Sequence, residues 1–134
     1  RVGDLEFSFS GLKSNILQVI QRESKKNPDF IKDNLYDLCA SIQYTIISIL
    51  LEKIDNAILK TGITQIAIAG GVSANSGLRN ALLERENTHK WSVFIPKFEY
   101  CTDNAAMIAI SGYYKFKDEQ FANSSVSANA RMKL

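Results

Sequence analysis

The stretch Ala69–Arg79 reads AGGVSANSGLR, and it connects a run of apolar residues to a run with helical spacing. A second stretch, Ile95–Ile110, reads IPKFEYCTDNAAMIAI and makes the same kind of connection. Backbone amides at a helix N-terminus have no partner within the helix, and the helix dipole adds partial positive charge there. Two such turns on neighbouring strands form a crevice at the carboxyl end of a sheet, where open α/β folds bind ligands. The two stretches therefore predict an α/β protein with a ligand site between these turns.

Four residues of the two turns have the chemistry that such a site needs. Gly70 and Gly71 let a ligand approach the backbone closely, because they carry no side chain. Asn75 can hydrogen-bond a ribose or a base through its amide group. Asp103 is a lone carboxylate, a group that hard and borderline metal cations bind well. These residues are our candidates for ligand binding.

Helix capping is the alternative interpretation of both turns. Ser73 or Asn75 can cap the helix after the first turn, and any residue of 102–104 can cap the helix that begins at Ala105. The first turn matches neither a P-loop nor the G-x-G-x-x-G dinucleotide pattern. One carboxylate is not a metal site, and the only histidine, His89, lies in a charged stretch typical of the surface. The spacing alone leaves capping and ligand binding both open.

Apolar periodicity predicts the elements around these turns. In chain order it indicates a half-buried strand over Leu5–Phe9, a helix capped by Ser10, one long helix or two nearly collinear ones from Pro28 to Gly62, a buried strand over 63–69, a helix over 76–86, a strand over 91–95 and a helix over 105–117. A strand, a helix and a strand in this register imply a right-handed crossover between two parallel strands. The small residues of the last helix allow it to pack closely on a neighbour.

The composition is that of a globular protein in one domain. The chain has 134 residues, 46% hydrophobic and 22% charged, which is enough to bury a core and too apolar for disorder. Its net charge of +2 is too small to indicate nucleic-acid binding by itself. Cys39, on the apolar stripe of the long helix, and Cys101 form no C-x-x-C pair, which favours a reducing compartment. The longest apolar run, Ile46–Leu51, is too short to cross a bilayer, so we expect a cytoplasmic protein that is not bound to a membrane.

Three motifs of this chain resemble, in the same order, the carboxyl-terminal part of the tRNA N6-adenosine threonylcarbamoyltransferase family, TsaD in bacteria. They are Phe7–Lys13 (FSFSGLK), Ala69–Arg79 (AGGVSANSGLR) and Cys101–Ala109 (CTDNAAMIA), with Ser125–Arg131 (SVSANAR) as a weaker match. The resemblance implies an α/β fold of the actin-like ATPase type (ASKHA, ribonuclease H-like), with a nucleotide cleft between two lobes. Residues 1–134 are then a single domain, the carboxyl-terminal lobe, with a small, partly parallel sheet flanked by helices. Residues 119–134 are expected to form an irregular tail, and the start at Arg1 without a methionine suggests a fragment.

The resemblance also implies an activity and a role for each candidate residue. Members of the family transfer a threonylcarbamoyl group from threonylcarbamoyl-adenylate to N6 of adenosine 37 in tRNA. Asn75 matches the asparagine that contacts the nucleotide, and Gly70 and Gly71 match the glycines of the same loop. Asp103 matches the carboxylate ligand of the catalytic metal, a divalent iron or zinc ion that can polarise the acyl carbonyl.

One departure from the family pattern limits what this chain can do. The family's other two metal ligands are histidines of an H-x-x-x-H helix in its amino-terminal part, which also holds the glycine-rich phosphate loop. Neither motif occurs in this chain. We therefore predict that the chain alone is inactive and binds the metal weakly or not at all. Surfaces that meet the other lobe are expected to be exposed, and exposed apolar surface favours self-association.

Two other functions remain open from the sequence. The first is a metalloprotease, because the family was formerly named an O-sialoglycoprotein endopeptidase, although this chain has no H-E-x-x-H motif. The second is a non-catalytic paralogue that serves as a partner subunit, although a scaffold has little need of Asp103 in the matching motif. For the enzyme, the resemblance implies tRNA and threonylcarbamoyl-adenylate as substrates. It also implies a catalytically dead paralogue and a P-loop ATPase as protein partners.

Overall fold

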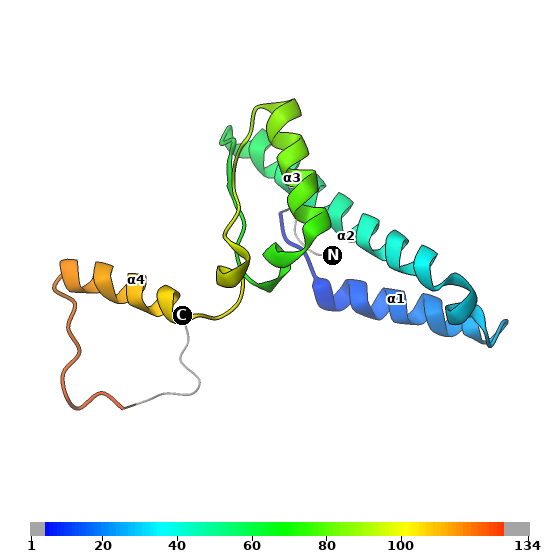
Figure 1. Cartoon of the computed structure of the whole chain (residues 1–134), viewed down its shortest axis with the longest axis horizontal. Coiled ribbons are helices and arrows are strands. Elements are labelled where there is room, and N and C mark those ends of the chain that lie inside the picture. The colour runs from blue at the N-terminus through cyan, green and yellow to red at the C-terminus, as the bar shows by residue number, and fades with distance from the viewer. Residues whose placement is uncertain (1–4, 128–134) are drawn as a thin grey trace.

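The computed structural model describes residues 5–127, which form four α-helices, two short strands and two 3-10 turns (Figure 1). In chain order the elements are α1 (Phe9–Ser24), α2 (Phe30–Thr61), β1 (Gln65–Ala67), η1 (Gly71–Ala74), α3 (Ser76–His89), β2 (Ser92–Phe94), η2 (Phe98–Tyr100) and α4 (Ala105–Lys117). α1 and α2 form a helical hairpin, and α3 packs against α2. The predicted tail has no helix or strand from Asp118 to Ser127, and its remainder, 128–134, lies outside the described residues.

β1 and β2 are parallel neighbours, as predicted, with Ile66 opposite Val93. The pairing extends past the ends of the strands, because Ile68 N donates a hydrogen bond to Phe94 O (3.2 Å). The strand predicted over 63–69 is present as β1, but the prediction that it is buried is wrong, since β1 has three residues and only the middle one is half-buried. A sheet of two strands leaves alternate side chains of each strand in solvent.

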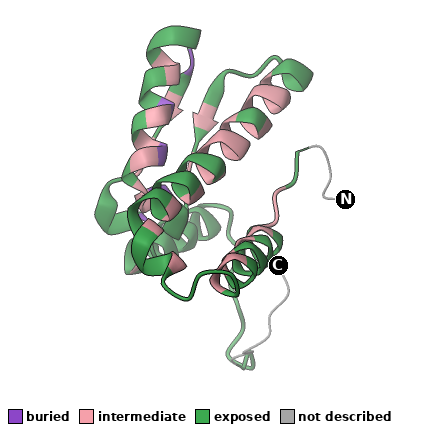
Figure 2. Cartoon of the chain, turned by 90° about the vertical axis from the view of Figure 1, so that its right-hand side faces the viewer, coloured by how far each residue is buried: buried purple, intermediate pink, exposed green. Residues whose placement is uncertain are grey.

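The core lies between α2, α3 and the sheet (Figure 2). Its buried members are Leu78, Leu82 and Trp91, and Leu82 has no exposed surface. Half-buried residues of α2 and of the sheet pack around them: Ile47, Leu50, Leu51, Ile54, Ile58, Ile66, Ile68 and Val93. At Gly77 the two helices are so close that a Cβ would lie 2.9 Å from Ile47 Cδ1. The start of α3, and with it the turn before α3, is therefore held on α2.

The long helix α2 ends where the sequence predicts. Gly62 has a φ of +70° and donates its N–H to Ile58 O (2.8 Å), as a helix-ending glycine does. Non-helical backbone at Asn34 marks a kink near the start of α2. The segment is therefore helical on both sides of a kink, which is why the apolar pattern allows either one long helix or two nearly collinear ones. Cys39 is exposed, so its predicted place on the apolar stripe does not bury it.

Within residues 5–127, α2 is also the one helix long and apolar enough to cross a membrane. The prediction from the run Ile46–Leu51, that no segment can span a bilayer, is therefore too strict. Length and composition are weak indications, because the core helix of a water-soluble protein meets the same criteria. Here α2 packs against α1 and α3, and its half-buried apolar side chains border the core, while none of its residues is fully buried.

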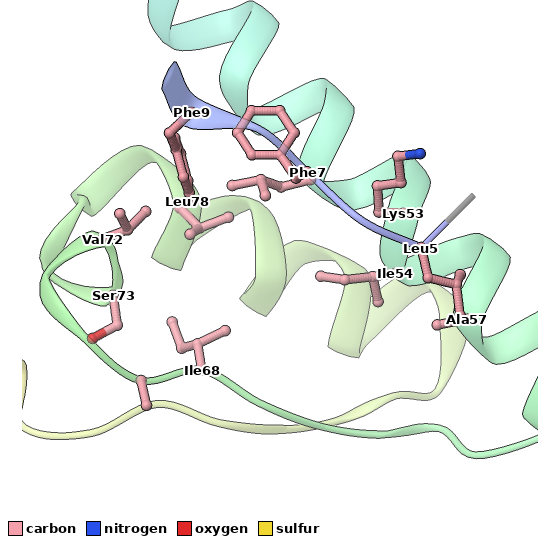
Figure 3. Close-up of a pocket in the computed structure, with 12 residues that line it drawn as sticks. Leu5, Phe7, Phe9, Lys53, Ile54, Ala57, Ile68, Val72, Ser73 and Leu78 are labelled. Atoms are coloured by element: carbon pink, nitrogen blue, oxygen red, sulfur yellow. The ribbon is translucent and has the colours of Figure 1, made fainter. Parts of the chain in front are cut away.

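The predicted strand over Leu5–Phe9 does not form, and the predicted cap at Ser10 is wrong. α1 begins at Phe9, and its cap is Ser8, whose Oγ accepts a hydrogen bond from Gly11 N (3.1 Å). A strand needs a partner for its backbone hydrogen bonds, and the sheet of the described residues consists of β1 and β2 alone. The alternating apolar side chains instead face a cavity of about 410 Å³ (Figure 3), which is lined by Leu5, Phe7, Phe9, Leu50, Lys53, Ile54, Ala57, Ile68, Ala69, Val72, Ser73 and Leu78.

The last helix, α4, extends away from the other elements (Figure 1), and each of its residues is exposed. The prediction that its small residues pack on a neighbour is not met within the described part of the chain. Its exposed apolar side chains are Met107, Ile108, Ile110, Tyr113, Tyr114 and Phe116. Exposed apolar surface, which we predicted for a lobe without its partner, is thus present on this helix.

Candidate functional site

Two turns leave the same edge of the sheet, because β1 and β2 are parallel. The first turn runs from the end of β1 through η1 to α3, and the second runs from the end of β2 through η2 to α4 (Figure 1). The candidates Gly70, Gly71 and Asn75 lie together in the first turn, and Asp103 lies in the second. No hydrogen bond of the described residues joins Asp103 to the three candidates of the first turn.

Gly70 determines the shape of the first turn. Its φ of +78° and ψ of 177° lie in a region that glycine adopts freely and other residues rarely do. Its carbonyl oxygen accepts hydrogen bonds from Ser73 N (3.0 Å) and Ser73 Oγ (2.7 Å), and Ser73 is buried. A Cβ at Gly70 or Gly71 would have nothing of the described chain within 4 Å. The backbone of this turn is therefore accessible from outside, as close approach by a ligand requires.

Asn75 caps α3, so the capping interpretation of this residue is confirmed. Its Oδ1 accepts a hydrogen bond from Leu78 N (2.9 Å), whereas Ser73, the other candidate cap, bonds to Gly70. Capping uses the oxygen of the amide and leaves the Nδ2 donor, which bonds to no other residue within 5–127. A contact with a ligand through Nδ2 is compatible with the cap.

Asp103 does not cap α4, because Asn104 does. Asn104 Oδ1 accepts from Met107 N (3.1 Å), and its Nδ2 donates to Thr102 O (2.8 Å). Asp103 is exposed and makes no hydrogen bond or ion pair with the described residues. The capping interpretation of the second turn therefore applies to Asn104 and leaves the carboxylate of Asp103 available to a ligand.

The residues of the described chain do not fit a resident metal ion. Between residues 5 and 127 there is no cluster of three or more His, Cys, Asp or Glu side chains that could hold one. His89 is exposed, as predicted, and its Nδ1 lies 2.7 Å from Thr88 Oγ1, at the far end of α3 from the two turns. Asp103 alone can supply one ligand, which is not a site, so we derive no catalytic step through a metal from this chain.

Arg79 joins the two turns, a role that the sequence analysis missed. It projects from the first turn of α3, where its Nε donates to Ser73 O (2.6 Å). Its Nη2 donates to Pro96 O (2.8 Å) and to the sulfur of Cys101 (3.0 Å), both in the second turn. A cation in the first turn of a helix is opposed by the helix dipole, and this was the available signal that Arg79 has a specific partner.

The fold is of the α/β class, with a small parallel sheet of two strands and two turns that leave its carboxyl edge. The chain belongs to the family described as TsaD: tRNA N6-adenosine threonylcarbamoyltransferase, whose family model matches residues 2–110. This confirms the resemblance that three motifs indicated.

Three relatives, each named tRNA N6-adenosine threonylcarbamoyltransferase, are similar over almost the whole chain. The protein of Christiangramia forsetii is 57% identical over 134 residues, which are 100% of this chain and 39% of the relative. That of Riemerella anatipestifer is 54% identical over 129 residues, 96% of this chain and 38% of the relative. That of Cytophaga hutchinsonii is 45% identical over 128 residues, 96% of this chain and 37% of the relative. The chain thus spans about two-fifths of the length of the relatives that it matches.

Proposed function

We propose that this chain is part of an enzyme that transfers a threonylcarbamoyl group from threonylcarbamoyl-adenylate to N6 of adenosine 37 in tRNA. The observation that carries the proposal is the identity of 57% over all 134 residues to a relative with the name of that transferase. We further propose that the intact protein has the two-lobed actin-like ATPase fold, with residues 1–134 as its carboxyl-terminal lobe. The two parallel strands with helices around them are consistent with such a lobe.

Within this function the two turns bind different parts of the substrate. The open backbone at Gly70 and Gly71 and the Nδ2 donor of Asn75, in the same turn, suit the nucleotide part, which offers several hydrogen-bond acceptors. Asp103 is proposed as one ligand of a divalent iron or zinc ion whose other ligands lie elsewhere in the intact protein. The chain by itself is then inactive and binds such an ion weakly or not at all.

The proposed setting follows from the same function. The intact enzyme would act in the cytoplasm on tRNA, without a membrane, and with a catalytically dead paralogue and a P-loop ATPase as protein partners. These partners come from the family resemblance, and no surface of the described residues is assigned to any of them.

The proposal is tested by assaying threonylcarbamoyl transfer to tRNA with the intact protein and its partners, beside the 134-residue chain. We expect transfer by the intact protein and none by the chain alone. Peptide cleavage without transfer by the intact protein would instead support the metalloprotease, and an intact protein with neither activity would support the non-catalytic paralogue. Tight, stoichiometric metal on the isolated chain would contradict the assignment of the missing ligands to the rest of the protein.

The substitution Asn75→Asp in the intact protein separates capping from ligand binding. Asp caps a helix as well as Asn does, so the stability of α3 should be unchanged, whereas the Nδ2 donor is lost. We expect transfer to fall about tenfold, the effect of one lost hydrogen bond of ordinary strength. The matched control is Asn80→Asp, which makes the same change at an exposed position of α3. Equal activities of the two variants would mean that Asn75 caps α3 and has no role in ligand binding.

Self-association of the isolated chain is a further property that can be measured. The apolar side chains that α4 exposes have no cover within residues 5–127, and apolar surface of this kind promotes association. We expect the apparent mass from light scattering to rise with protein concentration. A constant monomer mass up to high concentration would contradict this expectation.

A further inference from the structure

The side chain of Arg79 is the centre of a hydrogen-bonded link between the two turns. Its donors reach Ser73 O at 2.6 Å, Pro96 O at 2.8 Å and Cys101 Sγ at 3.0 Å. Within residues 5–127 the guanidinium forms no ion pair with a carboxylate. Its partners are two backbone carbonyls and a thiol, so the geometry of the link depends on the rigid fork of the guanidinium group.

The groups at each end of this link are among the most buried of the structure. Ser73 is 1% exposed and is itself bonded to Gly70 O, next to the open backbone of the first turn. Cys101 is 2% exposed, and its sulfur also donates to Lys97 O at 3.5 Å, across the second turn. Cys101 lies two residues before Asp103 in the chain. The link therefore joins the backbone beside Gly70 to the segment that carries Asp103.

We propose that Arg79 is a positioning residue, which sets the distance between the turn with Gly70 and Asn75 and the turn with Asp103. Cys101 is the point in the second turn on which Arg79 acts. Neither residue needs to contact substrate. The hydrogen bonds of Arg79 do not depend on which reaction the protein catalyses, whereas the effect of this positioning on catalysis rests on the proposed transferase function. A substrate that spans both turns, with its nucleotide on the first and its acyl group on the second, requires this distance to be fixed.

The link is tested by the rate at which Ellman's reagent modifies the two thiols of the 134-residue chain. Cys39 is exposed and reacts fast, whereas Cys101 reacts slowly until the second turn opens. We expect Arg79→Met to speed the modification of Cys101 about tenfold, because a charge-assisted hydrogen-bond link is lost. The matched control is Arg85→Met, which removes another arginine of α3, one that pairs with Asp55 at 3.1 Å and, within residues 5–127, forms no hydrogen bond to either turn.

Far-UV circular dichroism distinguishes unfolding of the chain from local opening of the second turn. The Cys39→Ser variant, in which Cys101 is the remaining cysteine, assigns the slow phase to Cys101. If Arg79→Met does not fold, Arg79→Lys decides, because lysine keeps the charge and lacks the planar fork. A folded Arg79→Met or Arg79→Lys protein whose Cys101 is as slow as in the unaltered chain would overturn the proposal.

The consequence for catalysis is tested in the intact protein by two substitutions at Cys101. Serine keeps an acceptor for Arg79, whereas valine fills the buried space without one. We expect Cys101→Ser to keep most of the kcat and Cys101→Val to lower it about tenfold, with a smaller change in KM. A role in packing alone predicts the reverse order, and that order would overturn the positioning role. An intact protein without any transfer activity would refute the proposed function and leave the thiol result standing.

Discussion

Replacement of Asp103 by alanine in the intact protein is expected to reduce threonylcarbamoyl transfer by about a hundredfold or more without a loss of stability. The loss of activity follows if Asp103 binds a ligand or a cation, since one preorganised charge in an active site contributes on this scale. The unchanged stability follows from the structure, because Asp103 is exposed and bonds to nothing within residues 5–127. The substitution therefore separates an effect on function from an effect on folding.

Two neighbouring positions serve as controls for this experiment. Glu99→Ala removes another exposed carboxylate from the same turn and should leave transfer unchanged. Asn104→Ala removes the cap of α4 and should cost about 1 kcal/mol of stability, with a smaller loss of activity than Asp103→Ala. If Asp103→Ala keeps its activity, Asp103 has no role in the reaction and the proposed metal ligand is withdrawn.

The fold was predictable where local signals agree with the final contacts. The parallel pair of strands, the end of α2 at Gly62 and the helix after each turn all depend on short-range patterns that the structure keeps. The segment Leu5–Phe9 was not predictable, because its alternating pattern is typical of a strand and a strand also needs a neighbour. Within the described residues that neighbour is absent, so the segment lines a cavity instead.

The candidate site was predictable in its positions and less so in its interactions. The sequence placed Gly70, Asn75 and Asp103 in two turns at one edge of a sheet, and the structure has them there. Which residue caps each helix required coordinates, because Thr, Asp and Asn are all good caps. The link from Arg79 to Cys101 spans 22 positions of the sequence, and no spacing rule connects an arginine to a thiol at that distance.

Replacement of Leu82 by alanine is expected to destabilise the chain more than any other single truncation that we consider. Leu82 has no exposed surface and lies with Leu78 and Trp91 at the centre of the core. Truncation of a buried leucine costs about 2–5 kcal/mol, partly because the cavity collapses incompletely. That is a large share of the 5–15 kcal/mol that is typical of a folded domain. The measurement is urea denaturation followed by far-UV circular dichroism, with the midpoint lowered and the slope unchanged.

Leu83→Ala is the matched control, since it makes the same change one position further along α3. Leu83 is 43% exposed, so its truncation should change the free energy of unfolding by less than about 1 kcal/mol. The contrast between the two variants tests which face of α3 packs on α2, and with it the orientation of the turn that α3 begins. Equal losses for Leu82 and Leu83 would mean that α3 does not present this face to the core. The positions of Asn75 and Arg79 relative to the second turn would then be wrong as well, because both depend on how the start of α3 is held.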